Sequence, residues 1–464
     1  MRIDEKGFSI ESGEVLVGSG LLRKRNAQVI DRAEYMIENM RENSAYTHAL
    51  SITGKKVDAE LLEEYIDRYR WYRESWKKLP TLCIKNKQYG STLRQKKIHP
   101  LCIDIEVSAI CDLACPFCFR DYYVTPDKLM DEKLVYDLID QASVLGVPSI
   151  KFNWRGEPLL HPGLPEFIEY AKRKGILETV INTNATGLDE KKSRELISAG
   201  LDFMIYSFDG GSKETYEKMR PGRFKANSFD EVYGNIKRFK FIREEIGAVF
   251  PYTKIQMILT EDTFNEREQY FNLFSEYVDE VSVSQYSERG GELKDIDKNS
   301  RSLYEEAVKK YNLPSDVPYM KGPHGQMFVS RGRKACEQPF QRLPVTYEGR
   351  VAMCCYDWGA QHLIGYVDTK AFNNEVDYRT VIDKASRGVR GYKYYKNLRM
   401  PEEYNKTAKV VRTLEDIWYG EEIDKVRQKH VIGEINDVKV CRNCKFKDTY
   451  QWEEVELQAT NMRT

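Results

Sequence analysis

The sequence predicts an α/β fold built on parallel strands, and two observations carry this prediction. Between about residues 99 and 290, short apolar runs alternate with amphipathic segments. Six such β/α steps imply parallel strands joined by right-handed crossovers, as in a closed or partly closed barrel or a doubly wound sheet. The regions on either side lack this alternation, since residues 1–98 are rich in charge and the composition changes again near residue 320.

Residues 1–98 show no strong strand pattern and are expected to form a helical extension. Residues 58–79 place aromatic side chains at three- and four-residue steps, which predicts a helix that Pro80 ends. The aromatic positions are Tyr65, Tyr69, Tyr72 and Trp76. Interleaved basic residues would also suit RNA, but aromatic side chains at helical spacing first indicate packing, so we favour a stripe that packs on the next domain.

The middle region is expected to contain six strands and five helices. The strands are 102–107, 149–153, 179–182, 203–208, 254–259 and 280–283. The helices between them are 131–144, 164–174, 189–199, 228–245 and 266–276. In parallel sheets the loops at the carboxyl ends of the strands carry the reactive groups, so these loops are the place to look for a site.

A loop with three cysteines leaves the first of these strands. Residues 111–118 read CDLACPFC, with Cys111, Cys115 and Cys118 at spacings of four and three. Three thiolates can hold three irons of a [4Fe–4S] cube and leave the fourth iron open to a small molecule. Disulfides are not expected without a secretory signal, and structural zinc usually needs a fourth local ligand or a CxxC pair.

Three further strand ends carry small or polar residues. They read NWRGEP at 153–158, NTNATG at 182–187 and SFDGG at 207–211. Each alone fits ordinary turn chemistry. Four such loops at one end of a sheet, with the cysteine loop among them, predict a polar cofactor site.

The C-terminal region adds a second group of cysteines. Residues 345–347 and 351–354, joined across Glu348 and Gly349, read as a β-hairpin that places Cys354 on a strand. Composition alone leaves zinc and an iron–sulfur cluster open for the resulting four-thiolate set. The set is Cys336, Cys354, Cys441 and Cys444.

Residues 379–412 form a basic insertion with ten Lys or Arg against three Asp or Glu. Such a segment can grip an anionic substrate such as a nucleotide sugar, a phosphate or an acidic peptide. A solvated insertion is the simpler interpretation, and we favour it.

The composition excludes several classes of function. Lys plus Arg equals Asp plus Glu at 72 each, so no global field favours nucleic acid or a membrane. No signal peptide and no apolar run of membrane-spanning length are found. We therefore expect a soluble cytoplasmic protein of two or three domains.

With these residues assembled, the chain resembles the radical S-adenosylmethionine (SAM) superfamily, in the branch with a C-terminal SPASM or shortened twitch domain. The cysteine loop, with Phe117 before its last cysteine, is the most specific match. RGEP at 155–158 is similar to the family's GGEP loop, with Arg155 at the first glycine position, and IYSFDG at 205–210 is similar to its ISLDG strand end.

At the C-terminus, Cys336-x12-Gly349-x4-Cys354 and the CxxC pair at 441–444 are similar to the SPASM pattern, without the cysteines of a second auxiliary cluster. The resemblance implies a partial (β/α)6 TIM-like barrel at 99–320. It also implies a C-terminal α+β SPASM/twitch cluster-binding domain at 321–464, after the helical extension at 1–98.

The resemblance also implies cofactors and contacts. Cys111, Cys115 and Cys118 would ligate the radical-generating [4Fe–4S] cluster, and Cys336, Cys354, Cys441 and Cys444 one auxiliary [4Fe–4S] cluster. The implied SAM contacts are Gly156 and Glu157 at the methionyl amine, Ser207 and Arg220 at its carboxylate, Asn182 or Asn184 at the ribose, and Phe117, Gln256 and Ile258 beside adenine. A reducing partner such as flavodoxin or ferredoxin is implied as well.

The implied activity is reductive cleavage of SAM to a 5′-deoxyadenosyl radical that abstracts hydrogen from a substrate carbon. Our first hypothesis is modification of a ribosomally made peptide. The alternatives are dehydrogenation or epimerisation of a carbohydrate or nucleotide sugar by the same chemistry, and a zinc-stabilised RNA-binding protein. In an epimerase, Cys355 would be a candidate hydrogen donor, although a small buried hydrophobic role is the simpler interpretation.

Overall fold

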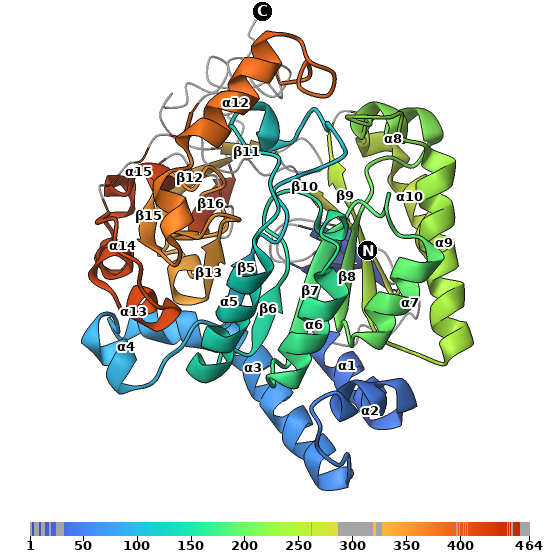
Figure 1. Cartoon of the computed structure of the whole chain (residues 1–464), viewed down its shortest axis with the longest axis horizontal. Coiled ribbons are helices and arrows are strands. Elements are labelled where there is room, and N and C mark those ends of the chain that lie inside the picture. The colour runs from blue at the N-terminus through green and yellow to red at the C-terminus, as the bar shows by residue number, and fades with distance from the viewer. Residues whose placement is uncertain are drawn as a thin grey trace, which may run out of the picture.

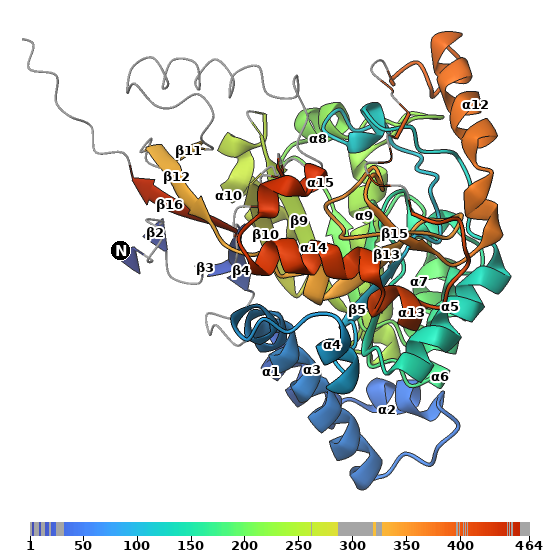
Figure 2. The same ribbon diagram turned by 90° about the vertical axis from the view of Figure 1, so that its left-hand side faces the viewer.

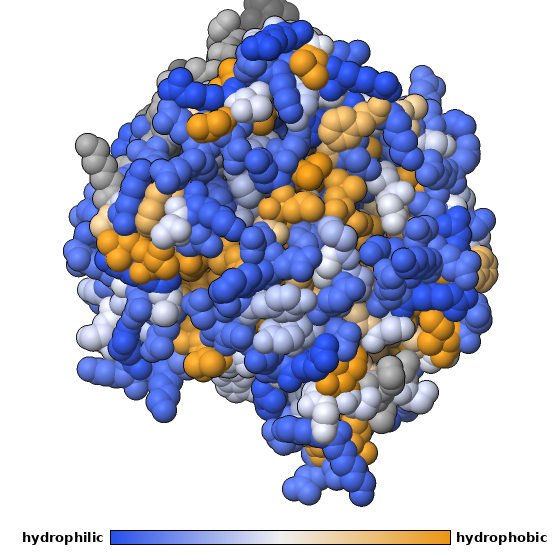
Figure 3. Space-filling model, in the orientation of Figure 1, coloured by the Kyte–Doolittle hydropathy of each residue, from blue (hydrophilic) through white to orange (hydrophobic). Residues whose placement is uncertain are grey.

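The computed structural model describes residues 32–260, 262–285, 327–395 and 407–442, with shorter stretches at both ends. The shorter stretches are 2–3, 9–10, 14–17, 20–24, 319–321, 398, 400, 401, 403, 405, 444, 446 and 449–454. Within these residues, no helix has the length and apolar character needed to cross a membrane. The face drawn in Figure 3 is largely hydrophilic, with smaller apolar patches between the polar side chains.

An eleven-stranded sheet organises the fold, in the order β15-β14-β13-β5-β6-β7-β8-β9-β10-β4-β3 (Figure 1). The six strands expected from the sequence are present, and neighbours among them are parallel. They are β5 (Cys102–Ile105), β6 (Ser149–Lys151), β7 (Glu178–Thr183), β8 (Phe203–Ser207), β9 (Tyr252–Leu259) and β10 (Glu280–Gln285). In the described residues the order runs between two edge strands, so the sheet is open. The α/β prediction is confirmed, and the open sheet is consistent with a partial barrel.

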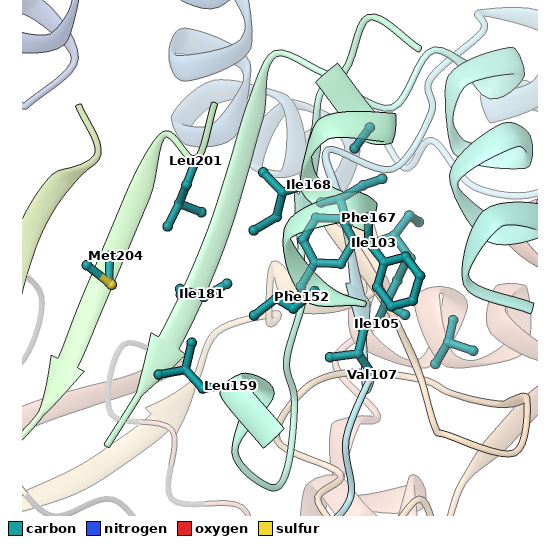
Figure 4. Packing of buried hydrophobic residues seen from close by; sticks show 14 of the residues in the cluster. Ile103, Ile105, Val107, Phe152, Leu159, Phe167, Ile168, Ile181, Leu201 and Met204 are labelled. Carbon is teal, nitrogen blue, oxygen red and sulfur yellow. The ribbon is translucent and has the colours of Figure 1, made fainter. Parts of the chain in front are cut away.

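The five helices expected between these strands are also present, within two residues of the predicted bounds. They are α5 (Glu132–Leu145), α6 (Leu164–Arg173), α7 (Glu190–Ser198), α9 (Phe229–Ile246) and α10 (Arg267–Phe274). One further helix, α8 (Lys213–Met219), was not predicted. Strand residues such as Ile103 and Ile181 pack with Phe152 and with Phe167 of α6 in one large apolar core (Figure 4).

The N-terminal region is helical, as predicted, and its aromatic stripe packs on the barrel. Its helices are α1 (Arg32–Glu42), α2 (Ser44–Ser51), α3 (Ala59–Lys85) and α4 (Ser91–Gln95). The buried hydroxyls of Tyr69 and Tyr72 on α3 donate to the carboxylate of Glu178 on β7, at 3.0 and 2.8 Å. This contact confirms the interpretation of the stripe as a packing surface.

Two expectations for the N-terminal region are wrong. Pro80 does not end its helix, because the turn beyond it buries Cys83 against Leu93 and Phe340, which stabilises α3 as far as Lys85. The first 24 residues also contain four short strands. They are β1 (Arg2–Ile3), β2 (Ser9–Ile10), β3 (Glu14–Val17) and β4 (Gly20–Lys24), of which β4 pairs antiparallel with β10 and so extends the main sheet.

The C-terminal region contributes the other edge of the same sheet through β13 (Arg342–Val345), β14 (Arg350–Ala352) and β15 (Leu363–Tyr366). β13 runs parallel to β5, and it forms the predicted hairpin with β14. The turn requires Gly349, whose φ is +96° and where a Cβ would lie 2.8 Å from the Asp368 Cβ.

The prediction that Cys354 lies on a strand is wrong. β14 ends at Ala352 after a register shift, and Cys354 begins a turn in which its carbonyl accepts from the Asp357 amide at 3.1 Å. The Asp357 carboxylate then accepts from the amides of Gln361 and His362 at 2.9 and 2.8 Å. These local bonds satisfy the backbone without a strand partner, so the cysteine lies on a loop.

Among the described residues, the remaining C-terminal elements include four α-helices and a separate three-stranded sheet, seen from the side in Figure 2. The helices are α12 (Glu375–Ser386), α13 (Leu414–Trp418), α14 (Glu421–Val431) and α15 (Lys439–Arg442). The strands are β11 (Tyr319–Lys321), β12 (Met327–Arg333) and β16 (Tyr450–Glu454). The domain boundary near residue 320 stays a prediction, because 286–318 lie outside the described residues.

Candidate active site

The three-cysteine loop lies beyond the carboxyl end of β5 and is held by the loops next to it. The Glu157 amide donates to the Ile110 carbonyl at 2.7 Å, and the Arg223 amide donates to the Asp112 carbonyl at 2.7 Å. These bonds come from the segments after β6 and after α8. The loop is therefore fixed on two sides by backbone contacts.

Its three thiols are partly exposed, and a local turn orders them. The Cys118 amide donates to the Cys115 carbonyl at 3.0 Å, and Asn184 Nδ2 lies 4.0 Å from Cys111 Sγ. Burial raises the pKa of Cys115 to about 12. A thiolate here needs a positively charged partner, which is the condition that a metal cluster provides.

Gly156 makes the close approach between the RGEP loop and the cysteine loop possible. Its φ is +69°, and a Cβ at this position would lie 2.2 Å from the Ser108 carbonyl oxygen and 2.7 Å from that of Ile110. Only glycine fits such a contact. The RGEP loop therefore packs backbone to backbone on the segment that leads into the cysteines.

The Glu157 carboxylate is buried and accepts several hydrogen bonds. It accepts from Thr183 Oγ1 at 2.6 Å, from the Asn184 amide at 2.7 Å and from the Leu159 amide at 3.1 Å. Burial, followed by the charge of Asp112, raises the pKa of Glu157 to about 8. Its side chain ties the loop after β6 to the end of β7.

Arg220 and Asp209 form a second centre at the ends of β8 and β9. Arg220 Nε donates to Asp209 Oδ2 at 2.8 Å, and the Ile258 amide donates to Asp209 Oδ1 at 2.6 Å. The Arg220 guanidinium lies 5.8 Å from the centre of the Phe117 ring. The structure thus brings three of the predicted SAM contacts together: Phe117, Arg220 and Ile258.

The other predicted contacts lie on the same ends of the strands. Ser207 ends β8, and its partner in the sheet is Gln256 on β9. Asn182 lies on β7, and its buried Oδ1 has no hydrogen-bond partner among the described residues. Asn184 Nδ2 donates to Asp112 Oδ1 at 2.8 Å. A free buried acceptor beside ordered loops is the kind of atom that a polar ligand satisfies.

Arg155 stands where the resembled family's GGEP loop has its first glycine, and its contacts give this arginine a structural role. Its side chain is fully buried and donates to the Glu106 carboxylate from Nε and Nη2, at 2.5 and 2.6 Å. Its guanidinium lies 5.2 and 5.7 Å from the ring centres of Trp154 and Trp358. The arginine therefore joins Glu106, the residue after β5, to Trp358 in the C-terminal region.

A buried charge cluster behind the cysteine loop was missed by the sequence reading. Asp127 accepts from both Nη atoms of Arg223 at 2.6 and 2.8 Å, from Arg120 at 3.1 Å and from the Tyr392 hydroxyl. Arg223 Nη1 also donates to the Cys111 carbonyl at 3.3 Å. No local pattern connects these residues, because the aspartate and the tyrosine are 265 positions apart.

The basic insertion is therefore partly a packing element. Tyr392 and Tyr395 are buried, whereas Arg379 and Arg387 on and after α12 pair with acids four residues earlier in the chain. Lys396 and Arg399 lie outside the described residues. The ion pairs of Arg379 and Arg387 favour the interpretation of a solvated helix face over that of an anion-binding segment.

The second cysteine set lines one cavity in the C-terminal region, together with Arg333 and His430. The four cysteines are Cys336, Cys354, Cys441 and Cys444. The Arg333 guanidinium donates to the carbonyls of Cys441 and Cys444. Burial lowers the pKa of His430 to about 4, so its imidazole is neutral near pH 7. Neither the arginine nor the histidine stands in a motif that could have signalled this position.

The spacing of these side chains bears on the kind of metal site. In the described part of the chain, no three His, Cys, Asp or Glu side chains gather around one point as ligands of a single ion would. Four cysteine thiols line one cavity here, and both a zinc ion and a four-iron cube accept four thiolates. The donor set therefore fits either group.

Cys355 lies beside this set and is partly buried. Its thiol donates to Gln338 Oε1 at 3.4 Å, and its carbonyl accepts from Trp154 Nε1 at 2.9 Å. Its side chain packs on the apolar cluster that contains Trp154. These contacts agree with a packing role, and the role of hydrogen donor stays a prediction.

Residues 105–273 match the family model of the radical SAM superfamily. A tungsten-containing aldehyde ferredoxin oxidoreductase cofactor-modifying protein of Pyrococcus furiosus is 26% identical over 165 residues, covering 35% of this chain and 44% of the relative. A GTP 3′,8-cyclase of Chlorobaculum tepidum is 34% identical over 125 residues, covering 26% and 37%. The chain thus spans less than half the length of these relatives.

Two solved structures are similar over longer stretches. SuiB of Streptococcus suis bound to the precursor peptide SuiA is 14% identical, with a TM-score of 0.45, over 92% of this chain and 90% of that chain. BtrN in complex with AdoMet and 2-DOIA is 17% identical, with a TM-score of 0.40, over 75% and 93%.

Proposed function

Because residues 105–273 of this chain match the family model of the radical SAM superfamily, we propose that the protein is a radical SAM enzyme that modifies a peptide, with one auxiliary [4Fe–4S] cluster in its C-terminal region. The observation that carries the proposal is the convergence of the cysteine loop with the RGEP loop and the ends of β7, β8 and β9. This is the face where parallel α/β sheets place their reactive groups.

The chain's own residues have distinct tasks in this proposal. Cys111, Cys115 and Cys118 would hold the first cluster, and the Gly156 backbone, which lies close to the segment that leads into them, would bind the methionyl amine of SAM. When bound, the cluster supplies the electron that cleaves SAM to the radical that takes hydrogen from the substrate. The protein orients the reactants and excludes water.

The polar side chains around the loop orient SAM. Asn182 Oδ1, which is buried and unpartnered among the described residues, is available to a ribose hydroxyl. Arg220 is held by Asp209 through Nε and Nη2, so Nη1 is the nitrogen proposed to meet the SAM carboxylate. Phe117 lies beside that guanidinium and offers an apolar face to adenine. Ser207, Gln256 and Ile258 complete the rim.

The choice of a peptide over an anionic metabolite has one structural support. The basic insertion was the feature that favoured a nucleotide sugar, and two of its described arginines, Arg379 and Arg387, pair with Glu375 and Asp383. No disulfide joins any two of the ten cysteines, all of which lie in the described residues, which supports a reducing, cytoplasmic setting with flavodoxin or ferredoxin as the electron donor.

The test begins with protein purified without oxygen. We expect about eight irons per chain and about four after Cys111, Cys115 and Cys118 are changed to alanine. Reduction with SAM should yield 5′-deoxyadenosine, and a candidate precursor peptide should raise its rate above that with aminoglycosides or nucleotide sugars. Protein that holds zinc and no iron would refute the proposal. A rate of 5′-deoxyadenosine formation that rises with sugars and not with the peptide would refute the peptide substrate.

A further inference from the structure

His430 is a polar neighbour of the four-thiol cavity for which the proposed function has no role. It lies in the last turn of α14 and is 2% exposed. Its Nδ1 lies 3.0 Å from the Cys336 backbone nitrogen, and its Nε2 lies 3.5 Å from Cys441 Sγ. The ring thus bridges two members of the cysteine set from one side.

The backbone amide decides the tautomer of this ring. An amide N–H can only donate, so Nδ1 must accept the bond from Cys336 and carries no proton. In the neutral imidazole, Nε2 then carries the proton and directs it at Cys441 Sγ. A protonated nitrogen has no lone pair left for a metal, so the geometry makes His430 a donor to sulfur and not a ligand.

The position of the ring is set by the packing of α14. Arg427, one turn earlier, is fully buried and donates to the carbonyls of Pro339 at 3.0 Å and Trp418 at 2.7 Å. Ile423 and Val426 on the same helix are buried as well. The helix is therefore docked on the segment that follows Cys336, and the distance between Nε2 and Cys441 Sγ follows from this docking.

We propose that His430 is a positioning residue that donates an Nε2–H···Sγ hydrogen bond to Cys441 and thereby raises the reduction potential of the auxiliary cluster. This inference rests on the proposed function, because it needs that cluster. Hydrogen bonds to the sulfurs are one of the factors that set the potential of an iron–sulfur cluster. A donor stabilises the reduced form most, because that form carries the greater negative charge on its thiolates.

The experiment uses the full chain in a background that holds the auxiliary cluster alone. Cys111→Ala, Cys115→Ala and Cys118→Ala together remove the ligands of the other cluster. In this background, His430→Leu removes both hydrogen bonds, and His430→Gln keeps an amide that can donate to sulfur. His99→Leu changes a half-buried histidine that bonds to Tyr419, away from the cysteine set, and is the control.

Iron content and the midpoint potential, followed by electron paramagnetic resonance during a redox titration, are the readouts. We expect His430→Leu to keep the iron of its parent and to have a more negative midpoint. The midpoint of His430→Gln should lie between those of the parent and His430→Leu, and the midpoint of His99→Leu should equal that of the parent. If leucine disturbs folding, His430→Met takes its place, because a methionine side chain cannot donate to the sulfur either.

An unchanged midpoint in both His430 variants would overturn the inference. Loss of iron from both would also overturn it, because His430 would then be a ligand. A third outcome is that the parent with the three cysteine changes holds zinc or no metal, before any histidine is changed. That result refutes the auxiliary cluster of the proposed function and is distinguishable from a failure of the hydrogen bond.

Discussion

Replacing Arg155, the first residue of the RGEP loop, tests whether its buried contacts with Glu106 and Trp358 stabilise the fold. Arg155 and Glu106 are both fully buried, and two charge-assisted bonds of 2.5 and 2.6 Å join them. Arg155→Met keeps most of the side-chain volume but leaves Glu106 without its counter-charge. Breaking one side of a buried ion pair typically costs about 3–5 kcal/mol.

The pH dependence of this loss follows from the same pair. Burial raises the pKa of Glu106 even with the arginine in place, and removing the arginine raises it further. A carboxyl whose folded pKa is raised stabilises the fold while protonated, and that stability is lost as the pH rises through the folded pKa. The defect of Arg155→Met should therefore be smaller at pH 5.5 than at pH 7.5.

The assay is urea unfolding followed by circular dichroism at both pH values, with Glu106→Gln as the matched second change. Gln keeps an oxygen for the Tyr347 amide, which donates to Glu106 at 3.0 Å. The double variant should recover a large part of the lost stability, because no buried charge remains. A loss below about 1 kcal/mol, or one that does not change with pH, would refute this account of the pair.

Three other changes test the cysteine loop and its supports. Gly156→Ala places a Cβ against the Ser108 carbonyl at positive φ, so 5′-deoxyadenosine formation should fall at least about tenfold; wild-type turnover would contradict the close approach. Glu157 has a pKa raised to about 8 by burial, so its contribution to stability should decline between about pH 4.5 and 8. The urea midpoint of Glu157→Gln should not decline over this pH range. Midpoints that fall equally with pH in the variant and in the unchanged protein would be evidence against this role of Glu157. Tyr392→Phe removes a donor to Asp127 and should lower the free energy of unfolding by about 1–2 kcal/mol. Tyr394→Phe, at a side chain that is 40% exposed, is its control and should lower it by less than about 0.5 kcal/mol. Equal urea midpoints in the two variants would argue against the buried bond.

The parts of the fold predicted well from sequence depend on local patterns. Apolar runs of strand length and amphipathic segments between them located β5 to β10 and their helices. The cysteine spacing located the loop that those strands present at one face. These features are visible in a window of a few residues, because the side-chain period of a strand or helix is a local property.

The parts that were missed depend on contacts between distant residues. Asp127 meets Tyr392, Arg155 meets Trp358, and His430 meets Cys441 only after the chain has folded. Pro80 was expected to stop a helix because the local rule ignores what the next turn buries. Tertiary packing decides such cases, and no single-sequence pattern reports it.

The sheet itself shows why the cysteine loop and the C-terminal region cannot be treated separately. β5 leads into the loop, and it has β6 on one side and β13 on the other, with Val345 of β13 opposite Ile105 of β5. Without β13, the strand that carries the loop would be an edge strand with unpaired backbone groups. The C-terminal region therefore stabilises the first cysteine set through the backbone of β5, through the contact of Trp358 with Arg155 and through the bond of Tyr392 to Asp127, while it carries the second set itself.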